Sequence, residues 1–137
     1  MLSKHIAVKN YPGKIPKVPV NKDLIEWVME NLFKNSVDAI SRTEGLIEIK
    51  TEFIERENLV RIHHIDNGRG IPWDEHVNIF SAGYTTKDRG WGLGLTLAKR
   101  IVEDYHNGRI YVSWSQKDKG TAFCIVLPVM NPASKPT

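Results

Sequence analysis

Features that mark other classes of protein are scarce in this sequence. Only one of its 137 residues, Cys124, is a cysteine, which excludes an intramolecular disulfide and any zinc site built from several cysteines. No apolar run approaches the roughly 20 residues that a membrane-spanning helix requires, and no signal-peptide pattern opens the chain. The net charge is only +3, from 19 Lys and Arg against 16 scattered Asp and Glu. We therefore expect no nucleic-acid partner and no direct membrane contact.

The residues that are present indicate one folded domain. The sequence is 41% hydrophobic and 26% charged, which is typical of a soluble globular protein. A chain of this length buries roughly two-thirds of its unfolded surface, so it needs no disulfides to hold a core. We expect residues 1–20, with three prolines, to be an extended lead-in, residues 21–128 to be the domain, and residues 129–137 to be a disordered tail. We expect a cytoplasmic location.

Hydrophobic periodicity predicts two long helices and four strands. Apolar residues at helical spacing predict a first helix over residues 22–41, capped by Asn21, and a second over residues 93–105. Alternating apolar and polar residues predict strands over residues 46–54, 59–65, 109–116 and 121–127. Because short turns join neighbouring strands, the expected fold is an α/β two-layer sandwich (α+β). Its sheet is mixed and largely antiparallel, with the helices on one face.

A glycine cluster directly precedes the second predicted helix. It holds Gly90, Gly92 and Gly94, and the first backbone amides of such a helix have no partner within it, which favours an anion such as phosphate. On this motif alone, a flexible hinge is an equally good interpretation. The cluster is neither a Walker A loop nor a Rossmann fingerprint, because no Gly-Lys-Ser/Thr follows and no parallel βαβ unit surrounds it.

Two further polar motifs lie at the ends or edges of predicted elements. Asp66 begins Asp-Asn-Gly-Arg-Gly at the end of a strand; most such pentapeptides are turns, but the carboxylate suits an exocyclic amine such as that of adenine. Gly68 and Gly70 would let a flat ring lie against the backbone. On the first helix, Asn31 and Asn35 lie one turn apart; they form either a polar edge or a file of oxygen ligands for a hard cation such as Mg²⁺.

Taken in order, these motifs resemble those of the GHKL superfamily of ATPases and kinases, over nearly the whole chain from residue 21 to residue 127. Its N, G1, F and G2 boxes and its last nucleotide motif are similar to residues 31–36, 66–71, 80–87, 90–95 and 120–123. Thr85-Thr86-Lys87 running into the G2 box, and residues 105–110, resemble sensor histidine kinases in particular. By this resemblance, the chain is identified as the catalytic and ATP-binding domain of a sensor histidine kinase.

The resemblance implies a Bergerat-type fold that binds ATP with Mg²⁺. Asp66 would contact the adenine amine with help from Thr121, and Asn35 would hold the Mg²⁺ against the triphosphate. Residues 71–89 would form a movable lid, in which Lys87 reaches a terminal phosphate. Asn35 is the implied metal ligand, and the implied nucleotide-binding residues are Asn31, Asn35, Asp66, Gly68, Gly70, Ile71, Lys87, Gly90, Gly92, Leu93, Gly94, Leu95 and Thr121.

The chain lacks a recognisable phosphoacceptor. None of its five histidines stands in a His-Glu/Asp-x-Arg-x-Pro-like helical box, and His63 and His64, inside a strand, are better interpreted as structural. We therefore expect an excised domain of a two-component protein-histidine kinase, inactive in cis, with no catalytic residue assigned in this chain. The γ-phosphoryl acceptor would be a histidine on an absent dimerisation domain of the same protein, and the downstream partner a response regulator receiver domain. Any anchor in the inner membrane would belong to the absent part.

Two other functions stay open. The first is a GHKL conformational ATPase of the gyrase, chaperone or mismatch-repair type, which places a general-base Glu four residues before the second Asn. This chain has Asn31 there, and Glu30 lies about 100° around the helix. The second is a degenerate nucleotide fold that serves as a binding module, against which the presence of Asp66, Asn35 and the three glycines speaks. Asp38 stands where many histidine kinases carry a basic residue, which disfavours a phosphate contact from that turn.

Overall fold

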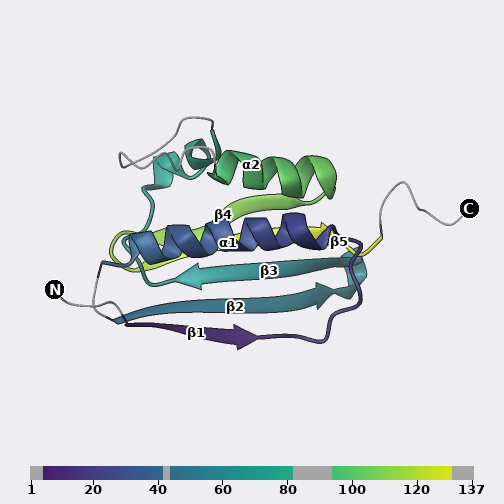
Figure 1. The fold of residues 1–137 in the computed structure, drawn as a ribbon, viewed down its shortest axis with the longest axis horizontal. Helices are drawn as coiled ribbons and strands as arrows, with labels where there is room; N and C mark the ends of the chain where they lie inside the picture. The colour runs from purple at the N-terminus through teal and green to yellow at the C-terminus, as the bar shows by residue number, and fades with distance from the viewer. Residues whose placement is uncertain (1–4, 42–43, 82–93, 131–137) are drawn as a thin grey trace, which may run out of the picture.

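A five-stranded mixed sheet lies beneath a layer of helices in the computed structural model, which describes residues 5–41, 44–81 and 94–130 (Figure 1). The strand order is β1-β2-β3-β5-β4, and only β1 and β2 pair in parallel. The strands are β1 (His5–Tyr11), β2 (Glu44–Ile54), β3 (Leu59–Asp66), β4 (Arg109–Gln116) and β5 (Gly120–Pro128). The predicted two-layer α/β sandwich with a largely antiparallel sheet is therefore confirmed.

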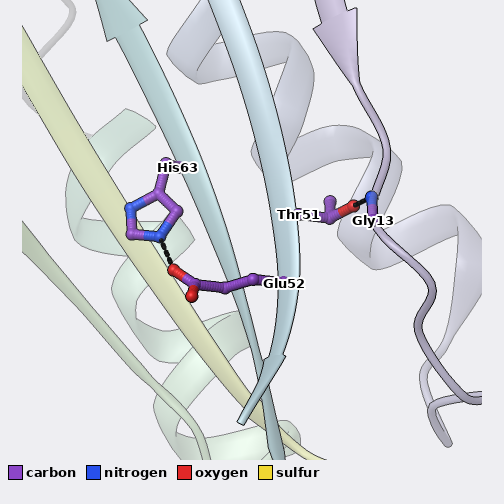
Figure 2. A network of polar contacts seen from close by, with 4 residues as sticks. All are labelled: Gly13, Thr51, Glu52 and His63. Carbon is purple, nitrogen blue, oxygen red and sulfur yellow. Dashed lines mark hydrogen bonds and ion pairs between the residues drawn. The ribbon is translucent and has the colours of Figure 1, made fainter.

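Strand β1 forms an edge of this sheet inside the stretch that the sequence suggested only as extended. Its register places His5 beside Glu44 and Tyr11 beside Lys50. Nearly all of its residues are exposed, so it lacks the alternation of apolar and polar residues that marks a half-buried strand. Beyond it, Gly13 N–H donates to Thr51 Oγ1 at 3.0 Å, which ties the following segment to β2 (Figure 2).

The first helix, α1 (Lys22–Ala39), begins where the sequence predicts and ends two residues earlier. Asn21 caps it, since its Oδ1 accepts a hydrogen bond from Leu24 N at 3.0 Å. Its buried residues are Val28, Asn31, Leu32 and Ser36, which follow helical spacing and form its inward face. Two polar residues on this face, Asn31 and Ser36, are therefore turned toward the interior.

The second helix changes its winding along its length. It is α-helical over Gly94–Arg100 (α2) and continues as a π-helical turn over Ile101–Tyr105, so the described part of the predicted helix is helical throughout. His106 then joins the two helices: its Nδ1 lies 2.8 Å from Ile101 O, and its Nε2 accepts from Asn21 N at 3.0 Å. This ring fixes the end of the second helix against the start of α1.

The core lies between the helical layer and the sheet. Short 3₁₀ turns at Glu55–Glu57, Trp73–Glu75 and Asn78–Phe80 connect the larger elements. The last of these inserts Ile79 and Phe80 into the core, where Phe80 meets Phe123 edge-on. The buried hydrophobic members of this core are Val28, Leu32, Ile79, Phe80, Ala98, Ile101, Val102, Ile110, Phe123, Ile125 and Leu127.

Candidate functional site

A cavity of about 760 Å³ opens beside the C-terminal end of α1, a volume in the range of small-molecule sites. The segment after β3 and the turn between β4 and β5 form its other walls. Its lining residues are Asn35, Asp38, Ala39, Asp66, Arg69, Gly70, Ile71, Pro72, Trp73, Glu75, Ile79, Leu95, Ser115, Lys117, Asp118, Thr121 and Phe123. Six of the implied nucleotide-binding residues are among them: Asn35, Asp66, Gly70, Ile71, Leu95 and Thr121.

Asp66 is the most constrained polar group in the cavity wall. Its side chain is 5% exposed at the end of β3, where it lies opposite Thr121 of β5. Oδ1 accepts from Gly68 N–H at 2.8 Å, and Oδ2 accepts from the Ser36 hydroxyl at 2.7 Å. Burial raises the pKa of this carboxyl, while the hydrogen bonds from Ser36, Gly68 and the Thr121 backbone and the charge of Arg69 oppose that rise.

The segment after Asp66 is held on both sides by backbone. Arg69 N–H donates to Ala39 O at 3.0 Å, and Arg69 O accepts from Asp118 N–H at 2.8 Å. A Cβ atom at Gly68 would lie 2.8 Å from Ala39 O, and one at Gly70, whose φ is +81°, would overlap Gln116 O. The space that a side chain would need at these glycines is therefore taken by protein backbone.

Ser115 joins this segment to the hairpin of β4 and β5. Its Oγ accepts from Ile71 N–H at 2.7 Å, donates to Gly120 O at 3.0 Å and lies 2.9 Å from Thr121 Oγ1. Gly120 has a φ of +142°, and a Cβ atom there would overlap Asp66 O, so the backbone at Gly120 lies against the end of β3 with no room for a side chain. This seam sets Thr121 and Asp66 side by side in the cavity wall.

The two asparagines of α1 occupy different surroundings. Asn35 lines the cavity together with Asp38, so oxygen atoms gather on that wall. Asn31 does not line it; it is 8% exposed, and its Nδ2 donates to Trp27 O at 2.9 Å. A Cβ atom at Gly94 would lie 2.7 Å from Asn31 Oδ1, which brings the start of α2 against this residue. Glu30 is exposed and does not line the cavity.

Four of the residues named from the sequence, Lys87, Gly90, Gly92 and Leu93, lie outside the described residues, as does part of the expected lid. In the part of the chain that the structure describes, no group of three or more His, Cys, Asp or Glu side chains is arranged to hold a metal ion. In the same residues, no helix combines the length and the apolar character needed to cross a membrane.

Sequence reasoning missed three polar residues at the site: Ser36, His64 and Ser115. His64 is fully buried in β3, and its Nε2 lies 2.9 Å from the Ser36 hydroxyl that contacts Asp66. For two of them the sequence periodicity indicated burial, since Ser36 falls on the apolar face of α1 and His64 on the inward side of β3. Their meeting depends on how α1 lies across the sheet, which no local pattern specifies.

Comparison with known proteins places this geometry in a family. The sequence profile of the histidine kinase-, DNA gyrase B- and HSP90-like ATPases matches residues 20–131. The sensor histidine kinase ZraS of Escherichia coli (strain K12) is 37% identical over 115 residues, which are 84% of this chain and 24% of ZraS. The chain thus spans about a quarter of the length of this curated relative.

Solved structures agree in fold. The catalytic domain of histidine kinase ThkA, in a nucleotide-free form, superposes with a TM-score of 0.78 at 30% identity, covering 90% of this chain and 79% of that domain. Histidine kinase ThkA in complex with response regulator protein TrrA matches with a TM-score of 0.76 at 26% identity, covering 95% of this chain and 36% of the kinase.

Proposed function

This chain belongs to the family of histidine kinase-, DNA gyrase B- and HSP90-like ATPases, and from that membership we propose that it is the ATP-binding catalytic domain of a sensor histidine kinase. It binds ATP with Mg²⁺ and presents the γ-phosphoryl group to a histidine on a dimerisation domain outside this chain. We assign residues 21–128 as the nucleotide-binding domain, to which β1 adds an edge strand, and residues 71–89 as its lid, which Ile79 and Phe80 anchor in the core. The receiver domain of a response regulator then takes the phosphoryl group.

The observation that carries this proposal is the buried carboxylate of Asp66 in the wall of a nucleotide-sized cavity. Three hydrogen bonds from protein hold it, so its position is fixed before a ligand arrives. An ionised carboxylate only accepts hydrogen bonds, and the amine of adenine supplies a donor. Thr121 lies beside it and lines the same wall, which supports a second polar contact to the base.

The side-chain oxygen of Asn35 fits the hard-cation chemistry of Mg²⁺, which uses few protein ligands when it accompanies phosphate. When bound, Mg²⁺ neutralises charge on the triphosphate. We assign Asn35 as its protein ligand, with Asn31 one turn away beside the phosphates. Lys87 and the backbone at Gly90, Gly92, Leu93 and Gly94 complete the proposed phosphate contacts, and the base contacts include Gly68, Gly70, Ile71 and Leu95.

Four of the five described histidines are held within the fold, which supports an acceptor outside the chain; the fifth, His5, lies exposed on the edge strand β1. His63 is paired with Glu52, His76 Nε2 lies 3.0 Å from Ile71 O, and His106 joins the two helices. His64 is fully buried. Phosphoryl transfer needs the acceptor nitrogen in line with the γ-phosphorus, and a side chain held in this way within the fold cannot move into that position.

An equilibrium titration with a fluorescent ATP analogue tests the proposal. We expect saturable binding by the isolated chain that depends on Mg²⁺ and is lost in Asp66→Ala. If binding is absent, the fold serves as a binding module without nucleotide. If Asp66→Ala binds as well as the unmodified protein, Asp66 does not recognise the base and the kinase assignment loses the observation that carries it. Joining the chain to a dimerisation domain with a histidine hairpin should then give ATP-dependent phosphorylation of that histidine.

The rate of steady-state ATP turnover distinguishes a conformational ATPase from the proposed kinase domain. Such an enzyme needs a carboxylate that activates water, and Glu30 is exposed and lies outside the cavity wall. We therefore expect negligible steady-state phosphate release by the isolated chain. Sustained release that Glu30→Gln abolishes would replace the kinase assignment with the ATPase.

A further inference from the structure

Three buried polar side chains, Ser36 of α1 and His64 and Asp66 of β3, form one continuous chain that ends at the cavity wall. His64 Nε2 lies 2.9 Å from Ser36 Oγ, and Ser36 Oγ lies 2.7 Å from Asp66 Oδ2. All three are shielded from solvent, with exposed fractions of 0% for His64, 1% for Ser36 and 5% for Asp66. Phe33 of α1 meets the His64 ring edge-on, with the ring centres 5.6 Å apart, and so holds its plane.

The number of available protons determines which group donates in each of these two hydrogen bonds. A serine hydroxyl has one proton, and here it is donated to Asp66 Oδ2. The contact with His64 then requires the ring to donate, so Nε2 carries hydrogen and Nδ1 is bare. Burial lowers the pKa of His64 to about 4, so the ring is neutral at physiological pH and carries only this one hydrogen.

The unpartnered atom of the ring agrees with this direction. Among the described residues, His64 Nδ1 has no hydrogen-bond partner and is buried. If the chain ran the other way, from a protonated Asp66 through Ser36 to Nε2, the hydrogen would sit on Nδ1 and leave a buried N–H donor without an acceptor. Native proteins avoid orphaned buried N–H groups more strictly than under-used acceptors.

The direction determines which ligand atom Asp66 can meet. With Ser36, Gly68 and the Thr121 backbone all donating to it, the carboxylate has three of its roughly four acceptor positions occupied and no proton of its own. The remaining position accepts a hydrogen bond and repels an oxygen. A 6-amino purine supplies the donor, whereas a 6-oxo purine places a carbonyl oxygen against a carboxylate oxygen.

We propose that His64 and Ser36 are positioning residues that hold Asp66 as an acceptor and thereby set a preference for 6-amino over 6-oxo purine nucleotides. This inference rests on the proposed function, because it concerns the base of the same nucleotide. His64 acts through Ser36 and does not touch the ligand.

The test compares ATP with inosine triphosphate, which differs at position 6 of the base, in equilibrium titrations of the full chain. In His64→Phe the ring shape is kept and the N–H donor is lost, so Ser36 is free to turn its proton away from Asp66. We expect the ATP-over-inosine-triphosphate preference to fall roughly threefold to tenfold, the range of one hydrogen bond. His64→Gln restores an N–H at the position of Nε2 and should restore the preference.

His63→Phe is the matched control. His63 is the neighbouring residue of β3, but its side chain points to the opposite face of the sheet and pairs with Glu52 (Figure 2). This variant should keep the preference of the unmodified protein. An unmodified chain that does not bind ATP would contradict the proposed function itself. An unmodified chain that prefers ATP, with His64→Phe keeping that preference or weakening both nucleotides equally, would overturn the positioning role alone.

Discussion

At the scale of single residues, the site depends on acceptor atoms that the fold holds in place. Asp66 is fixed by donors on both of its oxygens, and Asn35 presents an amide in the wall of the same cavity. The other lining residues give the cavity its shape, whereas the side chains of Asp66 and Asn35 supply the acceptor groups that would recognise a ligand. Replacement of Asp66 by a residue of the same shape, and truncation of Asn35, should therefore change binding more than folding.

Asp66→Asn replaces one acceptor oxygen by an N–H₂ group that faces a donor, either Ser36 or Gly68. We expect ATP binding to weaken at least tenfold, in line with about 1.5–3 kcal/mol for a hydrogen bond to a charged group, while GTP stays poor. Titration with both nucleotides measures this. If ATP and a purine nucleotide without the amine weaken equally, Asp66 does not read the amine.

Asn35→Ala removes the proposed Mg²⁺ ligand from the cavity wall without touching the buried face of α1. We expect the gain in nucleotide affinity on adding Mg²⁺ to shrink strongly, whereas affinity in EDTA and the melting temperature of the free chain change little. Parallel titrations with and without Mg²⁺ provide the measurement. A large fall in melting temperature would make Asn35 a structural residue.

At the scale of elements, the sequence predicted the helices and strands whose formation depends on residues close together in the chain. The start of α1 followed from Asn21 and helical spacing, and β4 was predicted over the same residues that the structure shows. Strand β1 escaped because it is an exposed edge without alternation, and its parallel pairing joins residues about 40 positions apart. The π-helical turn and the contact of His64 with Ser36 depend on packing between layers, which no sequence window contains.

The junction between the segment after β3 and the hairpin makes a prediction at this scale. Ser115→Ala leaves the partly buried Ile71 N–H without its acceptor, which costs about 1 kcal/mol, the low end for an unsatisfied donor. We expect faster hydrogen exchange at Ile71 and a lower urea midpoint. Ser113→Ala is the control: Ser113 is exposed, donates only to Ala122 O at 3.2 Å, and should shift neither quantity appreciably. Unchanged exchange at Ile71 would show that Ser115 does not hold this junction.

At the scale of the whole molecule, the buried ring of His64 links folding to pH. Its pKa is about 4 in the folded protein against 6.5 when exposed. As pH falls from 6.5 to 4, the unfolded chain binds a proton that the folded chain excludes, so the free energy of unfolding falls. The full effect is on the order of 3 kcal/mol, present above pH 6.5 and lost by about pH 4.

Urea denaturation of the unmodified protein and His64→Phe at pH 7 and pH 5 measures this linkage. The unmodified protein should lose more stability between these values than the variant, by roughly 2 kcal/mol. Asp66, whose pKa is raised by burial, favours the folded state as it takes up a proton. Because His64→Phe weakens the Ser36 hydrogen bond that opposes this rise, the Asp66 pKa rises further in the variant, which widens the difference between the two proteins in the same direction. Equal losses would mean that His64 is not excluded from protonation in the folded state.

The close contact between β5 and the end of β3 at Gly120 restricts which amino acids can occupy position 120 during evolution. Because a Cβ atom at this position would overlap Asp66 O, and φ is +142°, all nineteen alternatives are strained in the same way. In a saturation library sorted for folded protein alone, codon 120 should return glycine only, whereas codon 66 should tolerate small polar residues until the library is sorted for nucleotide. Position 120 should then be invariant under both selections, because the fold requires glycine there. Position 66 should be invariant only under selection for nucleotide binding, because only binding requires aspartate there.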